Sequence, residues 1–140
     1  MNPTSKYILD ACALIAYLND EPGADIVSSL LEKMENCFVS LLLHKINLLE
    51  VYYGYYRERG KSLADEMFED ILSSDIQILS DISNDMLMKA GRFKGSYSIS
   101  LGDAILLAAA SVSGSAVLTC DHHEFDAVEK EEMITFEWIR

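Results

Sequence analysis

The sequence has few basic residues, few prolines and no repeated or low-complexity segment. Its 11 Lys and Arg stand against 23 Asp and Glu, which gives a net charge of −12 over 140 residues. A protein that binds nucleic acid mainly by neutralising phosphates needs a basic face. The deficit therefore argues against charge-driven binding of nucleic acid, although not against a metal-assisted nucleic-acid enzyme. With only two prolines and no linker-like stretch, we expect a single domain over residues 1–140.

Cysteines and long apolar runs are also scarce. The three cysteines, Cys12, Cys37 and Cys120, form no C-x-x-C pair and cannot all pair with one another, which is typical of a reducing compartment. The longest apolar segment, residues 104–112, is too short to cross a bilayer. The first apolar stretch, residues 7–18, is interrupted by an acid and lacks the cleavage pattern of a signal peptide. We therefore expect a cytoplasmic protein with no membrane partner.

What the sequence does contain is apolar residues, which make up half of the chain and whose spacing predicts strands alternating with helices. The expected strands cover residues 7–9, 37–40, 76–79, 116–119 and 133–136, and the expected helices cover residues 11–18, 24–33, 44–60, 63–72, 83–93, 101–112 and 123–127. Strands and helices that alternate in this way form a parallel sheet with helices on both faces. The pattern therefore predicts an α/β fold.

Four acidic residues occupy positions that need an explanation. Asp10 and Asp121 each directly follow an expected strand, and in open α/β sheets ligands bind outside the carboxyl ends of the strands. Asp103 lies in the first turn of a helix that is apolar on most sides, and Glu50 lies among apolar residues within another helix. Each acid also has an ordinary explanation as a cap, a turn residue or a solvated side chain. The pattern alone leaves open whether the four share one site.

The segments that carry these acids resemble, in order and spacing, the four motifs of PIN-domain nucleases. They are residues 7–15, 47–51, 101–105 and 117–125. The resemblance spans nearly the entire chain. The chain is similar in particular to the small VapC-like toxins of toxin–antitoxin pairs. The resemblance implies a three-layer α/β/α sandwich with a central, mostly parallel sheet, and endonucleolytic cleavage of RNA. It also implies a cognate antitoxin and a homodimer as partners.

Carried over position by position, the resemblance assigns Asp10, Glu50, Asp103 and Asp121 to the metal site and to catalysis. Carboxylate-rich coordination suits hard ions such as Mg²⁺ or Mn²⁺ better than zinc. Clustered carboxylates repel one another unless a cation intervenes. A bound divalent ion lowers the pKa of an attacking water, so this chemistry requires no nucleophilic side chain.

Other polar residues near these motifs have less definite roles. Asp126 either joins the acidic cluster or is solvated. His122 and His123 are expected to face solvent or to cap a helix rather than to bind metal, with His122 the better candidate if one takes part. Arg92 and Lys94 precede the third acid and are candidate contacts for substrate phosphates, with an ordinary polar helix face as the alternative.

One position departs from the family pattern and keeps a second hypothesis open. Cys12 stands two residues after the first acid, where Ser or Thr is usual, and we expect its thiol to pack beneath the site. The departure also fits a PIN-like module that has lost catalysis and binds protein or RNA. A third hypothesis, a phosphoryl-transfer or phosphoacceptor domain, would use Asp10 alone and leave Glu50 without a role.

Overall fold

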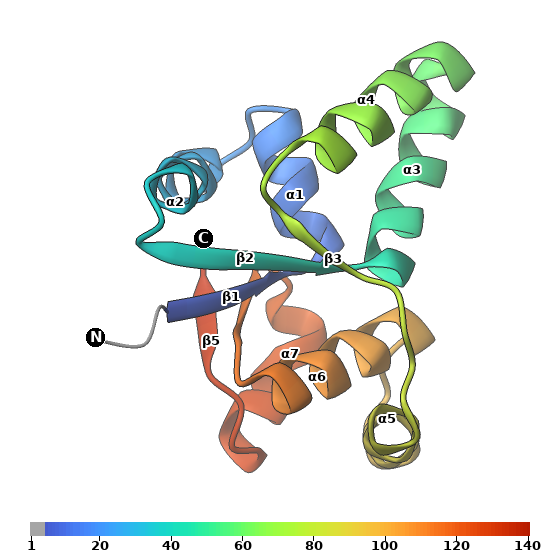
Figure 1. Cartoon of the computed structure of the whole chain (residues 1–140). Helices are drawn as coiled ribbons and strands as arrows, with labels where there is room; N and C mark the ends of the chain where they lie inside the picture. Colours follow the sequence, from blue (N-terminus) through green and yellow to red (C-terminus); the bar gives the residue numbers. More distant parts are fainter. Residues whose placement is uncertain (1–4) are drawn as a thin grey trace.

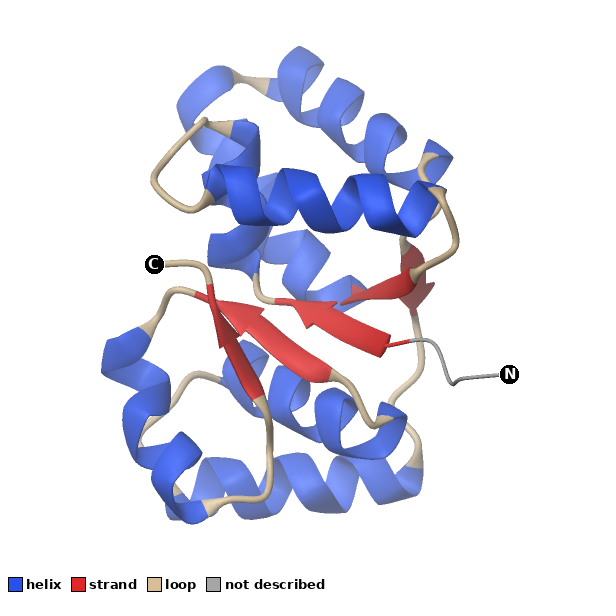
Figure 2. Ribbon diagram, turned by 90° about the vertical axis from the view of Figure 1, so that its left-hand side faces the viewer, coloured by secondary structure: helices blue, strands red, loops and turns tan. Residues whose placement is uncertain are grey.

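A computed structural model describes residues 5–140, which form a five-stranded parallel sheet between two layers of helices (Figure 1 and Figure 2). The strands are β1 (Ser5–Leu9), β2 (Val39–His44), β3 (Gln77–Leu79), β4 (Ala116–Thr119) and β5 (Phe136–Trp138), in the spatial order β3-β2-β1-β4-β5. The helices are α1 (Ala11–Leu18), α2 (Ala24–Glu35), α3 (Lys45–Arg59), α4 (Lys61–Ser73), α5 (Asn84–Ser96), α6 (Leu101–Ser113) and α7 (His122–Glu131). The expected α/β/α arrangement is confirmed.

The alternation of side chains along the strands divides the core into two layers. Ile8 of β1 and Val117 of β4 are buried against α5, α6 and α7, whereas the next residues, Leu9 and Leu118, are buried on the other face among residues of α1 to α4. Figure 1 shows these two groups of helices on opposite sides of the sheet. Helix α6 is buried from Ala104 to Ala110. No helix within the described part of the chain has the length and apolar character needed to span a membrane.

The chain reverses its direction across the sheet at β1. Strands β1, β2 and β3 follow one another outward, and the chain then returns through α5 and α6 to place β4 on the free side of β1. In open α/β sheets such a reversal leaves a crevice at the carboxyl ends of the two adjacent strands. Helices α1, α3 and α7 start at this edge because each follows a strand, and α6 starts there because it leads back to the beginning of β4. Their N-termini bring partial positive charge to the crevice.

Several element boundaries differ from those expected. Strand β2 begins two residues later and runs on through three leucines, because Cys37 adopts a left-handed backbone (φ 63°) that closes the turn after α2. A short leucine run has no period that distinguishes a buried strand from a buried helix. Helix α7 continues to Glu131, past the expected end at residue 127. The last strand begins only at Phe136, since Met133 is fully exposed.

Candidate metal centre

Asp10 directly follows β1 and caps α1, and both of its carboxylate oxygens accept hydrogen bonds from neighbouring residues. The Asp10 backbone N–H continues the sheet by donating to the Leu118 carbonyl at 3.0 Å. The Oδ1 atom accepts from the Ala11 N–H at 2.8 Å, and Oδ2 accepts from the Thr119 hydroxyl at 2.7 Å and the Cys12 thiol at 3.3 Å. The residue is only 5% exposed, and this burial raises the pKa of the carboxyl group despite the three donors.

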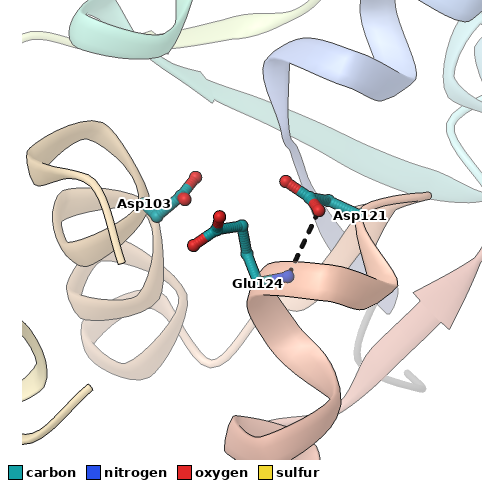
Figure 3. A group of neighbouring side chains, drawn as sticks. All are labelled: Asp103, Asp121 and Glu124. Carbon is teal, nitrogen blue, oxygen red and sulfur yellow. Dashed lines mark hydrogen bonds between the residues drawn. The ribbon is translucent and has the colours of Figure 1, made fainter. Parts of the chain in front are cut away.

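Thr119 connects Asp10 to Asp121. The fully buried Thr119 hydroxyl donates to Asp10 and accepts from the Asp121 backbone N–H at 3.0 Å. Asp121 in turn caps α7, with its Oδ1 accepting from the Glu124 N–H at 3.2 Å (Figure 3). One hydroxyl group therefore joins the two acids that follow the adjacent strands β1 and β4.

Asp103, Asp121 and Glu124 bring their carboxylates together (Figure 3). One oxygen atom of each lies within 4.8 Å of the others. Figure 3 shows the Glu124 side chain extending from α7 into the space between Asp103 and Asp121. The Ser100 hydroxyl, which caps α6, accepts from the Asp103 N–H at 3.1 Å and so places Asp103 in the first turn. Burial, followed by the charge of Asp10, raises the pKa of Asp103 to about 7.

Glu50 approaches the same acids from α3. The fully buried Asn47, one turn earlier, donates from Nδ2 to Glu50 Oε1 at 2.9 Å and to the Gly102 carbonyl of α6 at 3.3 Å. Gly102 permits this approach, because a Cβ atom there would lie 2.5 Å from Glu50 Oε1. Burial raises the pKa of Glu50, and the charge of Asp10 adds to the shift. Glu50 also contributes to the raised pKa of Asp103, so α3 and α6 share one electrostatic environment.

The acidic cluster, by which we mean Asp10, Glu50, Asp103, Asp121 and Glu124, fits a hard divalent cation. Its donors are all carboxylate oxygens, the ligand type that Mg²⁺ and Mn²⁺ prefer. Within residues 5–140 none of the five forms an ion pair with Lys, Arg or His. The upward pKa shifts of three of them have the direction expected when no cation offsets their burial and repulsion. A further buried oxygen, Asn47 Oδ1, has no hydrogen-bond donor among the described residues.

The structure brings the four acids singled out from the sequence to one edge of the sheet and adds Glu124, which sequence reasoning missed. The available signal was its spacing, because a residue three positions after a capping Asp lies in the first turn of the same helix. Asp126, the other candidate acid, lies outside the cluster on an exposed part of α7. Its Oδ1 atom lies 2.9 Å from His122 Nδ1.

The Cys12 thiol forms hydrogen bonds in addition to packing beneath the site. In addition to donating to Asp10, its Sγ lies 3.4 Å from Thr119 Oγ1 and accepts from the Cys120 backbone N–H at 3.3 Å. Burial raises the pKa of the Cys12 thiol, which favours the protonated form that this donation requires. The expectation of packing alone was incomplete, because the thiol makes the kind of hydrogen bond that a hydroxyl at this position would make.

Neither His122 nor His44 is directed at the acidic cluster. His122 Nδ1 faces Asp126 and its Nε2 lies 3.0 Å from the Arg140 carbonyl, while the ring stacks on Trp138 with centroids 3.9 Å apart. Hydrogen bonding to Asp126 is the main cause that raises the pKa of His122. His44 is buried and caps α3, because its Nδ1 accepts from the Ile46 N–H.

The two candidate phosphate contacts lie near the end of α5. The Arg92 guanidinium donates to both carboxylate oxygens of Glu132, at 2.9 and 3.2 Å, and stands over the Phe93 ring at 4.5 Å from its centroid. Lys94 is exposed in the last turn of the helix. Arg92 is therefore already engaged by an acid, and a phosphate would have to displace Glu132.

Comparisons with known proteins identify both a family and a fold. The sequence model of the PIN domain family matches residues 7–131. A search of curated protein sequences finds no significant match. A toxin–antitoxin complex from Klebsiella pneumoniae contains a chain of 20% identity and TM-score 0.65, with 87% of this chain and 92% of that chain covered.

Two other solved structures share the fold. One is DNA-bound VapBC from Salmonella typhimurium, with 18% identity, a TM-score of 0.71, and 98% of this chain and 100% of that chain covered. The other is VapC20 of Mycobacterium tuberculosis, a toxin that cleaves the sarcin–ricin loop, with 15% identity, a TM-score of 0.59, and coverage of 79% and 86%. At these identities the likeness establishes the fold.

Proposed function

We propose that this chain, which belongs to the PIN domain family, is a divalent-metal-dependent endoribonuclease and the toxin of a toxin–antitoxin pair. The observation that carries the proposal is the acidic cluster, which gathers at the reversal point of the sheet without a basic partner among the described residues. RNA as substrate is supported by the similarity in fold to a toxin that cleaves the sarcin–ricin loop. The toxin role is supported by the toxin–antitoxin complexes that share the fold.

Asp103, Asp121 and Glu124 would hold Mg²⁺ or Mn²⁺, with Asp10 and Glu50 beside them. When bound, such an ion lowers the pKa of an attacking water and offsets the charge that gathers on the scissile phosphate. The chain itself orients the acids. The hydroxyl of Thr119 and the thiol of Cys12 fix Asp10, and the amide of Asn47 fixes Glu50.

Protonation of the Asp103 carboxyl group would compete with cation binding. The pKa of about 7 for this group in the metal-free chain means that protons and cations compete for its oxygens near neutral pH. We therefore expect cation affinity, and with it cleavage, to rise as the pH rises through 7.

The two alternative hypotheses find less support. A catalytically impaired module was suggested by Cys12, but the Cys12 thiol still donates to Asp10 and the acids remain clustered. A phosphoacceptor Asp needs a carboxylate oxygen open to attack. Both oxygens of Asp10 already accept hydrogen bonds, and the residue is almost fully buried.

We assign the antitoxin to an apolar groove between α3 and α4. Its volume is about 350 Å³, and it is lined by Lys45, Leu48, Leu49, Tyr52, Asp65 and Phe68. Such a groove suits the apolar face of a short segment, with positive groups on the antitoxin complementing the net charge of −12. Of the candidate phosphate contacts, Lys94 is the better one, because Arg92 would first have to leave Glu132.

We assign the homodimer contact to the side of α3 that carries Tyr53 and Tyr56. The two rings are 49% and 50% exposed and lie three residues apart, so they share one face of the helix outside the antitoxin groove. Exposed aromatic residues of this kind are enriched at protein interfaces. Sedimentation velocity over a range of concentrations tests the assignment, and a purely monomeric chain at all concentrations would contradict it.

The direct test of the enzymatic proposal is cleavage of RNA by the purified chain. The wild type is incubated with Mg²⁺ or Mn²⁺ and, in parallel, with a chelator. Asp10→Asn should reduce cleavage at least about 100-fold, since loss of even an indirect support of a metal ligand costs roughly 10- to 100-fold. Asn also serves well as a helix cap, so α1 should persist.

The matched control is Asp25→Asn, which removes an exposed acid from the first turn of α2. This variant should cleave RNA as fast as the wild type. Full activity of Asp10→Asn, or undiminished cleavage in the presence of chelator, would overturn the proposal.

A further inference from the structure

Two cysteines lie beside the acidic cluster. Cys12 lies in the first turn of α1 and Cys120 directly follows β4, and both side chains are half-buried. Cys120 packs on the same face of the sheet as α1. Its backbone N–H donates to the Cys12 sulfur at 3.3 Å. The third cysteine, Cys37, is exposed after α2, at the opposite edge of the sheet.

This placement brings the Cys12 sulfur close to the atoms that a disulfide would use. The Cys12 sulfur lies 3.3 Å from the Cys120 backbone nitrogen, so it lies directly against the residue whose thiol would be its partner. Both residues belong to ordered segments that Asp10 and Thr119 already tie together. The cost of joining them is therefore small compared with that of joining two mobile loops.

We propose that Cys12 and Cys120 are an oxidisable dithiol. A hydroperoxide converts the two thiols to a Cys12–Cys120 disulfide bond beside the acidic cluster. Cys120 has no part in the RNA cleavage proposed above, whereas the Cys12 thiol helps to fix Asp10. The bond itself is independent of the proposed function, whereas its effect on the acidic cluster rests on that function.

With hydrogen peroxide the reaction balances in two steps. The Cys120 sulfur attacks one peroxide oxygen, the O–O bond breaks, and the other oxygen leaves with the thiol proton as water, which leaves Cys120 as a sulfenic acid. The Cys12 sulfur then attacks the Cys120 sulfur, the S–O bond breaks, and the hydroxyl group leaves with the Cys12 proton as a second water. The two thiols lose two electrons and two hydrogens, and the peroxide gains them. Cys120 reacts first because the Cys12 proton is engaged by Asp10.

The disulfide would change the surroundings of the acids. It removes the S–H donor from Asp10 Oδ2 and ties α1 to the residue before Asp121. We therefore expect the oxidised chain to bind Mn²⁺ about 10-fold more weakly than the reduced chain, an effect typical of a lost support behind a metal ligand.

The test counts thiols in a Cys37→Ser background, which leaves only the pair. After treatment with hydrogen peroxide, intact-mass spectrometry should show the loss of two hydrogens, and the number of alkylated thiols should fall from two to none. A reductant should restore both thiols, and the chain should run as a single polypeptide on a non-reducing gel. Adding Cys120→Ser should leave the Cys12 thiol open to alkylation under the same treatment.

Persistence of both alkylated thiols after peroxide, or a bond that links two chains, would overturn the dithiol. An oxidised chain that binds Mn²⁺ as tightly as the reduced chain would overturn its coupling to the acidic cluster. If the reduced chain binds no Mn²⁺, the proposed function fails, whereas the thiol count still decides whether the bond forms.

Discussion

The two ends of the parallel sheet hold very different residues. At the carboxyl end, the N-terminal turns of α1, α6 and α7 present Asp10, Asp103 and Asp121 to one another. At the amino end, a hollow of about 440 Å³ is lined by residues of β1, β4, β5 and the end of α6, among them Lys6 and Glu137. Strand direction explains why the acids gather at the carboxyl end, because helices that follow parallel strands all start at the same edge.

The two ends of the sheet also differ in whether their charged groups are exposed or buried. Lys6 and Glu137 are exposed and remain solvated. Asp10 and Asp103 are buried, and their pKa values are raised, so the metal-free protein holds them at a cost in folding free energy. Buried acids with raised pKa values are typical of a functional site. They occur at the carboxyl end of the sheet.

The largest effect that separates the two ends should appear in the pH dependence of stability. The pKa of Asp103 rises from 3.8 to about 7 on folding, so the folded chain holds this proton more tightly than the unfolded chain. Stability from this group is fully present below pH 3.8 and is lost as the pH rises through about 7. The loss should be on the order of a few kcal/mol, since one pKa unit corresponds to about 1.4 kcal/mol.

Chemical denaturation in the presence of chelator, at several pH values between about 4 and 8, measures this slope over the range set by the raised pKa. Asp103→Asn should remove much of the slope and make the metal-free chain more stable at the alkaline end. Glu137→Gln, at the amino end, should leave the slope as it is. An unchanged slope in Asp103→Asn would show that this carboxyl group is not the buried acid described above.

A smaller effect is expected from the contact between α3 and α6. In Gly102→Ala the added methyl group would lie 2.5 Å from Glu50 Oε1, so the Glu50 carboxylate must move away from the cluster. Because this atom is the end of a flexible side chain, the free energy of unfolding should change by less than about 1 kcal/mol, including the gain in helix propensity. Cleavage of RNA should fall roughly 10-fold, as for other losses of support near a metal site.

Gly91→Ala is the matched control, because a Cβ atom at this position of α5 meets nothing within 4 Å. It should stabilise the chain by up to about 1 kcal/mol and leave cleavage unchanged. Equal activities of the two glycine variants would break the link between Gly102 and Glu50.

Regular periodicity with clear boundary residues was sufficient to predict parts of the fold. Helix α1 and strand β4 have the expected bounds, since Asp10 caps the first and Gly114 ends the helix before the second. The expected relation to PIN-domain proteins is confirmed by the family match. The position of β2 was wrong because three successive leucines carry no period, and the left-handed turn at Cys37 has no signal in its residue type.

The site could be predicted only as far as strand ends and motifs identify single residues. Asp10 and Asp121 followed from strand ends, whereas Glu124 depends on the angle at which α7 leaves β4. Asn47 and Gly102 depend on how closely α3 and α6 pack, which no local pattern encodes. The roles of the acids in metal binding and RNA cleavage stay predictions.

Calorimetric titration with Mn²⁺ tests most directly whether the acidic cluster is a metal centre. The wild type should give saturable binding with a dissociation constant of about 1 mM or tighter, the range of an oxygen-ligand site of moderate affinity. Glu124→Gln removes a proposed ligand and should weaken binding at least about 10-fold. Asp126→Asn, which alters an acid outside the cluster, should leave it unchanged. Absence of saturable Mn²⁺ binding to the wild type would contradict the account.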